Sequence, residues 1–144
     1  MPQVDRSALV PYSAEQMYEL VNDVLSYPEF LPGCVGSRII NRTETTQEAA
    51  IDVAKIGIKK TFSTRNKMIP GREIDLELLE GPFRSLKGHW DFIPLGDDAS
   101  KVVFHLTFEF NNPLIDFAFN KIFSELMGNM VQAFIKRAKE IYHD

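Results

Sequence analysis

Two different hydrophobic periods meet near Asn112 in this sequence, and together they restrict the fold more than any other feature. Over residues 102–110 every second residue is apolar, which is typical of a β-strand with one buried face. Beyond Asn112, the expected N-cap, and Pro113, at the first helical position, apolar residues recur at helical spacing to about Tyr142. The core-facing stripe of this helix is Phe119, Phe123, Met127, Met130, Phe134, Ala138 and Ile141. The sequence therefore predicts a sheet packed against one C-terminal helix of about 30 residues, ~45 Å long.

The segments before this junction predict the rest of the element order. A first strand is expected over Gln3–Val10, and the capping box at residues 13–16 starts a helix that should run to about Leu25. A second cap at Ser26 predicts a helix of one or two turns. From Cys34 to Phe110, β-rich segments alternate with turn residues, which indicates about six antiparallel strands. The expected class is α+β: a curved antiparallel sheet of about seven strands wrapped round a long C-terminal helix, with two short helices after the first strand.

Length and composition exclude several classes of protein. The chain has 144 residues, which fits a single domain over 1–144. One cysteine, Cys34, excludes an internal disulfide and a Cys-rich metal cluster. The N-terminus lacks the basic and apolar segments of a signal peptide, and no run approaches the ~20 apolar residues of a membrane span. We therefore expect a soluble protein without a transmembrane segment in a reducing, intracellular compartment.

The first half of the C-terminal helix is apolar on more of its circumference than one packing partner can cover. A deeply buried helix, or one with a dimer partner, would show the same pattern. A sharper interpretation is that the helix roofs an apolar cavity, because flexible Met and flat Phe side chains suit a long hydrocarbon ligand. The residues expected to line such a cavity are Trp90, Phe92, Phe104, Leu106, Phe108, Phe119, Ile122, Phe123, Met127 and Met130.

A basic window interrupts an acidic chain. Residues 55–72 carry six basic residues and no acidic one, whereas the whole chain has a net charge of −4, so the rest of it carries −10. Alternation places Lys59, Arg65 and Lys67 on one strand face, which would suit contact with an RNA phosphate backbone. An exposed strand kept soluble by cations, or a face that neutralises the neighbouring acidic strand, explains the same pattern. Because the chain is acidic overall, we expect a local anionic partner and no DNA binding.

Catalytic motifs are missing from the sequence. Cys34 follows Pro-Gly without the pattern of a nucleophile, so a small buried thiol is expected there. His89 and His105 fall on the polar faces of strands, and with Asp91 or Glu109 they could bind a metal. Exposed histidines on strands are common without a metal, so we expect neither a catalytic residue nor a metal site.

Several stretches resemble a known family. They are PYSAEQMY at 11–18, LVNDV at 20–24, SYPEFLPGC at 26–34, KTFSTRN at 60–66, GPF at 81–83, FEF at 108–110 and NMVQAF at 129–134. In this order they resemble the RatA-type ribosome association toxins and coenzyme Q-binding proteins, which belong to the START-like superfamily. The likeness extends over essentially the whole chain.

The resemblance implies a helix-grip fold, no enzymatic activity and no cofactor other than a bound ubiquinone or similar isoprenoid lipid. It implies two partners: the large ribosomal subunit, whose union with the small subunit the toxins block, and an isoprenoid quinone. Because no mitochondrial transit segment is apparent, a bacterial cytoplasmic protein is expected. The superfamily also contains polyketide cyclases, so a cyclase or aromatase acting in the same cavity is the alternative. That alternative needs a polar or titratable group inside, and Arg38, Lys60 and Asn66 are the candidates.

Overall fold

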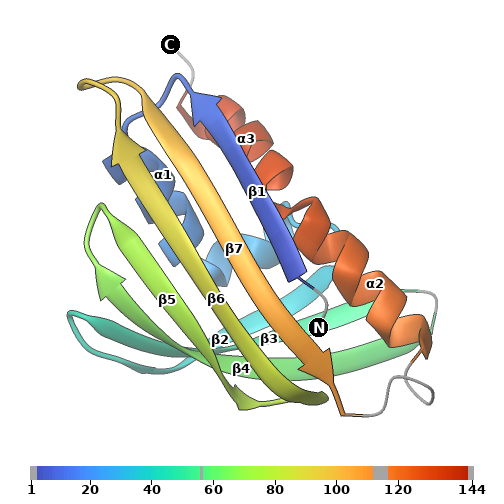
Figure 1. The fold of residues 1–144 in the computed structure, drawn as a ribbon. Coiled ribbons are helices and arrows are strands. Elements are labelled where there is room, and N and C mark those ends of the chain that lie inside the picture. The colour runs from blue at the N-terminus through green and yellow to red at the C-terminus, as the bar shows by residue number, and fades with distance from the viewer. Residues whose placement is uncertain (1–2, 56, 112–116, 143–144) are drawn as a thin grey trace.

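The computed structural model describes residues 3–55, 57–111 and 117–142, without the side chains of Lys55 and Ala118 (Figure 1). Its elements in chain order are β1 Gln3–Val10, α1 Ala14–Asn22, the 3₁₀ helix η1 Val24–Glu29, β2 Cys34–Arg42, β3 Thr46–Lys55, β4 Ile58–Ile69, β5 Glu73–Glu80, β6 Phe83–Pro94, β7 Ser100–Phe110, α2 Phe117–Gly128 and α3 Met130–Ile141.

One seven-stranded sheet forms the body of the molecule, in the order β1-β7-β6-β5-β4-β3-β2, and all of its pairs are antiparallel. The sheet is strongly curved, and the helices lie against its inner face (Figure 1). The predicted α+β architecture is therefore confirmed, including the two short helices after β1. No helix in the described part of the chain is long and apolar enough to span a bilayer.

The sequence places the start of α1 correctly but extends the helix too far. The Ser13 hydroxyl accepts a hydrogen bond from the Gln16 amide at 3.1 Å, and the Gln16 side chain accepts one from the Ser13 amide at 2.9 Å. The helix ends at Asn22, not near Leu25. Asp23, with φ −85° and ψ 72°, has a non-helical backbone conformation, and this ends the helix before Leu25. The chain tightens after Asp23 into the 3₁₀ helix η1, which confirms the second short helix, but η1 begins at Val24, so Ser26 lies inside it and is not its cap.

The C-terminal helix is broken, which corrects the prediction of one continuous helix. It consists of α2 and α3, which meet at Asn129. The carbonyl of Gly128 accepts a hydrogen bond at 3.1 Å from the Arg6 side chain on β1. Because glycine and asparagine are poor helix formers, this bond from outside the helix favours a break at Gly128–Asn129. The expected start of the helix at Asn112 and Pro113 lies outside the described residues.

The core lies between the inner face of the sheet and the helices. The alternating apolar residues of β7 all face it and are buried: Val102, Phe104, Leu106, Phe108 and Phe110. Phe123 of α2 is completely buried, and its ring centroid lies 4.8 Å from that of Phe83. Farther along the sheet, Trp90 stacks on Phe104 with 4.2 Å between centroids. The Phe123 ring thus packs α2 on the sheet, and the ring of Phe134, 5.6 Å from that of Trp90, packs α3 on it.

The capping box predicts a measurable loss of stability when it is removed. Ser13→Ala should lower the free energy of unfolding by about 1 kcal/mol, because the Gln16 amide at the start of α1 loses the hydroxyl that accepts its hydrogen bond. Urea denaturation followed by circular dichroism should show a lower midpoint with an unchanged slope. The exposed Ser124 of α2 provides the matched control, and Ser124→Ala should leave the midpoint nearly unchanged. Equal midpoints for Ser13→Ala and wild type would contradict this role for the capping box.

Candidate functional site

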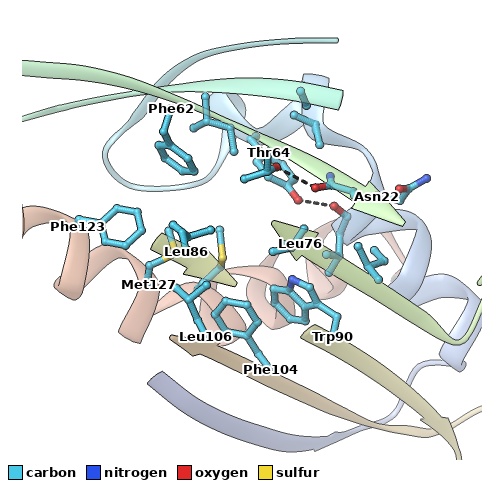
Figure 2. Close-up of a pocket in the computed structure, with 18 residues that line it drawn as sticks. Asn22, Phe62, Thr64, Leu76, Leu86, Trp90, Phe104, Leu106, Phe123 and Met127 are labelled. Carbon is cyan, nitrogen blue, oxygen red and sulfur yellow. Dashed lines mark hydrogen bonds between the residues drawn. The ribbon is translucent and has the colours of Figure 1, made fainter. Parts of the chain in front are cut away.

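An apolar cavity lies between the sheet and the helices, with a volume of about 50 Å³ (Figure 2). Six of the residues expected from the sequence line it: Trp90, Phe104, Leu106, Phe123, Met127 and Met130. Alternation in β6 and β7 directs the first three toward the helices, while helical spacing directs the others toward the sheet. We call this space the inner cavity.

Four of the expected residues do not line the inner cavity. Phe92 packs edge-on against Tyr18 of α1, with 5.8 Å between ring centroids. Phe108 and Phe119 belong to the ring cluster around Phe123. Ile122 faces a different cavity. Periodicity identified the buried face of each element. It did not identify the residues on that face that border a cavity.

The inner cavity is smaller than the sequence interpretation requires. Ligand pockets usually have volumes of roughly 300–1,000 Å³, whereas about 50 Å³ has room only for a few water molecules. The surplus phenylalanines of α2 fill the remaining space by packing on one another. The expected tail-sized space is therefore not open in this conformation, and a hydrocarbon ligand would have to displace wall residues.

A second cavity of about 230 Å³ lies at the break between α2 and α3. Its walls come from the segment that joins η1 to β2 and from both C-terminal helices: Leu31, Pro32, Gly33, Ala54, Ile122, Glu125, Leu126, Asn129, Met130 and Ala133. Met130 lines this cavity and the inner cavity. A methionine side chain adapts its shape easily, so the wall shared by the two cavities includes a flexible residue.

The inner cavity has a polar end, of which only Asn66 was named from the sequence. Asn22, Tyr27, Thr64 and Asn66 line it there, and the Thr64 hydroxyl donates a 2.8 Å hydrogen bond to Asn66 Oδ1 (Figure 2). The Tyr27 hydroxyl donates to the carbonyl of Val21, and burial raises the pKa of this tyrosine. Polar residues at alternate positions of β4, Thr64 and Asn66, on the face shared with Phe62, were the available signal.

Most of the polar groups that were candidates for cyclase chemistry lie outside the inner cavity. Of the three candidates, only Asn66 lines the inner cavity. Arg38 is 57% exposed and pairs with Asp52 at 3.4 Å. Lys60 is exposed near the start of β4. Among the described lining residues, Tyr27 is the only one with an ionisable side chain.

The three cations expected to contact RNA lie on β4 but do not form one cluster. Arg65 and Lys67 face a groove of about 210 Å³ on the outer side of the sheet, together with Lys87 of β6. Lys59 lies nearer the start of the strand, and its charge helps to hold the pKa of Asp52 below its usual range, after the larger effect of a hydrogen bond from Thr61.

Arg65 already has acidic partners on both neighbouring strands. Its guanidinium contacts Glu48 of β3 at 2.9 Å and Glu77 of β5 at 3.8 Å. Arg65 therefore fits the alternative interpretation of the basic window, in which a cationic strand face neutralises the neighbouring acidic strand.

The two strand histidines are neighbours, as expected, and both interact with carboxylates. His89 and His105 are paired in register, His105 contacts Asp5, and His89 Nδ1 contacts Asp75. His89 Nε2 lies 2.9 Å from Asp91 and 3.2 Å from Glu73. Glu109, the other expected partner, instead pairs with Arg84 at 3.2 Å.

Glu73, His89 and Asp91 have the spacing of a metal site, since their ligand atoms lie within 4.8 Å of one another. Protonation of His89 satisfies the same carboxylates. Partial burial acts to lower the pKa of His89, but hydrogen bonds to Asp75 and Asp91 outweigh it and raise the pKa. The absence of a metal therefore stays a prediction.

Cys34 is a buried thiol, as its sequence context predicts. Burial raises the pKa of the thiol to about 11, so it is neutral at physiological pH. Its Sγ lies 3.6 Å from the carbonyl of Gly36, and a protonated thiol is a poor nucleophile.

Comparison with known proteins gives consistent matches over nearly the full chain. The family model "Polyketide cyclase / dehydrase and lipid transport" matches residues 10–135. The persistence and stress-resistance toxin PasT of Escherichia coli is 59% identical over 142 residues, covering 99% of this chain and 90% of PasT. The ribosome association toxin RatA of Shigella flexneri is 58% identical with the same coverage. The mitochondrial coenzyme Q-binding protein COQ10 homolog B of Xenopus laevis is 28% identical, covering 97% of this chain and 59% of that protein.

Two solved structures show the same fold. The Zhui aromatase/cyclase from Streptomyces superposes with a TM-score of 0.85 at 18% identity, covering 99% of this chain and 96% of the cyclase. An 18 kDa protein of Caulobacter crescentus has a TM-score of 0.75 at 32% identity, covering 99% of each chain. The chain therefore belongs to the polyketide cyclase/dehydrase and lipid transport family of START-like proteins and, within it, to the RatA/PasT group.

Proposed function

We propose that this chain is a ribosome association toxin that binds the large ribosomal subunit and blocks its union with the small subunit. The observation that carries the proposal is 58–59% identity to RatA and PasT toxins over 99% of the chain. A protein that acts on ribosomes works in the cytoplasm, which is where we place it.

We further propose that the outer face of β4 contacts the phosphate backbone of ribosomal RNA through Lys59, Arg65 and Lys67. The groove that holds Arg65 and Lys67 supports this, since with Lys87 its three cations outnumber its two carboxylates, Asp75 and Glu77. Glu48 and Glu77 already neutralise Arg65, so the two lysines should contribute more than the arginine. Contacts of this kind position a protein on RNA without reading its sequence.

We also propose that the inner cavity binds an isoprenoid quinone or a similar lipid without chemical change. Three observations support this: the apolar walls of the cavity, the lipid transport family and the coenzyme Q-binding relative. The tail would pass from the second cavity into the inner cavity as Met130 moves aside.

A cyclase or aromatase is the second candidate, because the Zhui aromatase/cyclase shares the fold with a TM-score of 0.85. At 18% identity that likeness concerns the fold alone. Binding without catalysis is favoured because Tyr27 is the only ionisable residue among the described cavity walls, and burial raises its pKa. A neutral, buried tyrosine is a weak acid and a weaker base.

The ribosome proposal predicts a charge-dependent loss of binding. Lys59→Glu/Lys67→Glu should reduce co-sedimentation with purified large ribosomal subunits about tenfold or more at low salt, and wild-type binding should weaken as salt rises. Arg65 is left unchanged, because a glutamate there would meet Glu48 and Glu77.

Two matched variants separate this surface from others. Lys101→Glu/Lys121→Glu reverses two exposed lysines of β7 and α2 and should sediment like wild type. Lys136→Glu/Lys139→Glu reverses exposed lysines of α3. Equal sedimentation of folded Lys59→Glu/Lys67→Glu and wild type would exclude the β4 contact, and a loss only in the α3 variant would move the contact to that helix.

The ligand proposal predicts quenching of tryptophan fluorescence. Trp90 is the only tryptophan and lines the inner cavity, so a benzoquinone with a ten-carbon tail should quench it saturably. Ala49→Leu adds three carbons to a buried cavity wall and should weaken binding at least tenfold. Ser7→Leu adds a similar side chain at an exposed position of β1 and should bind like wild type. Unchanged saturable quenching in folded Ala49→Leu would place the quinone outside the inner cavity.

A further inference from the structure

One buried polar atom of the inner cavity has no partner. Asn22 Oδ1, at the C-terminal end of α1, is shielded from solvent and has no hydrogen bond within the described part of the chain. Its amide nitrogen is turned away from the other labelled cavity residues (Figure 2). Asn22 also borders a surface groove that Glu19 and Arg42 help to line, so this residue lies between the inner cavity and the surface. The carbonyl oxygen is therefore the part of Asn22 that the cavity offers to a ligand.

Hydrogen-bond donors complete this polar end. Thr64 and Asn66 are each 6% exposed, and their mutual hydrogen bond uses the Asn66 carbonyl oxygen. The remaining polar group of Asn66 is its N–H₂, which can only donate. Trp90 lines the same cavity, and its indole nitrogen, also only a donor, points toward Leu76 (Figure 2).

A buried acceptor without a donor needs an explanation, because a polar atom that gives up its hydrogen bonds to water on burial and finds no partner destabilises the fold. A hydroxyl group is suited to this end of the cavity, since it can donate to Asn22 Oδ1 and at the same time accept from a donor such as the Asn66 amide. A carbonyl oxygen can accept from the two donors but leaves Asn22 Oδ1 unpaired. The difference between the two groups is one hydrogen bond.

We propose that Asn22 makes the inner cavity selective for ligands whose ring carries a hydroxyl group, so that it holds the reduced hydroquinone in preference to the quinone. The inference rests on the proposed binding of an isoprenoid quinone at this site. Asn66 and Trp90 bind the ring oxygens in either redox form, whereas Asn22 distinguishes the two forms. The chain would then act as a carrier of the reduced form.

Isothermal titration calorimetry under anaerobic conditions tests this with one probe in two redox states: a benzoquinone with a ten-carbon tail and its hydroquinone. Wild type should bind the hydroquinone about tenfold more tightly, the difference expected for one buried hydrogen bond. Asn22→Leu should bind both forms with nearly equal affinity. Because the substitution removes an unpaired buried atom, thermal unfolding should confirm that this variant folds at least as stably as wild type.

Asn41→Leu is the matched control, because Asn41 is exposed on β2, outside the cavity walls, and it should keep the tenfold preference. Equal affinities in wild type, or a preference that persists in Asn22→Leu, would overturn the inference and show that water alone satisfies Asn22. Binding of neither form would refute the proposed quinone binding itself and this inference with it.

Discussion

Burial of aromatic rings between the curved sheet and α2 holds the structure together. Phe123 is completely buried, and its ring meets Phe62 of β4 and Phe83 of β6 at centroid distances of 5.6 and 4.8 Å. Strands that are distant in the sequence are therefore fixed to one helix by one side chain. The same packing leaves only about 50 Å³ for the inner cavity. A bound ligand would therefore need space that the stabilising rings now fill. The flexible side chains of Met127 and Met130 are the cavity walls that can move to make room for it.

The two faces of β4 separate the two proposed activities. Lys67 and Arg65 point to the outer groove, whereas Asn66, between them, lines the inner cavity. A strand alternates its side chains strictly, so charge on the outer face and polarity on the inner face can vary independently. One sheet can therefore present a surface for an anionic partner on its outer face and a site for an apolar ligand on its inner face.

Local patterns predicted the fold well, and contacts between distant residues account for most of what was missed. Alternation in β7 and the capping box at Ser13 are local, so both could be predicted from the sequence. The break at Gly128–Asn129 is favoured by a hydrogen bond from Arg6, 122 residues away, and no helical period reveals such a contact. Except for Asn66, the polar end was missed, because Asn22 and Thr64 come to line one cavity only after α1 packs against the sheet. The cavity walls were predicted only in part. Periodicity predicts which face of a helix or strand is buried, but not which residues on that face border a cavity.

The central claim is that an apolar ligand enters between the sheet and the helices, at the methionines of α2 and α3. Proton–carbon NMR of ¹³C-methyl methionine tests it directly, because the chain has five methionines and Met127 and Met130 line the inner cavity whereas Met17 and Met68 do not. Titration with a benzoquinone bearing a ten-carbon tail should shift the methyl signals of Met127 and Met130 and give nuclear Overhauser contacts from both to the tail. The signals of Met17 and Met68 should move much less. Saturable binding that leaves Met127 and Met130 unshifted would contradict the account, because the ligand would then lie outside the inner cavity.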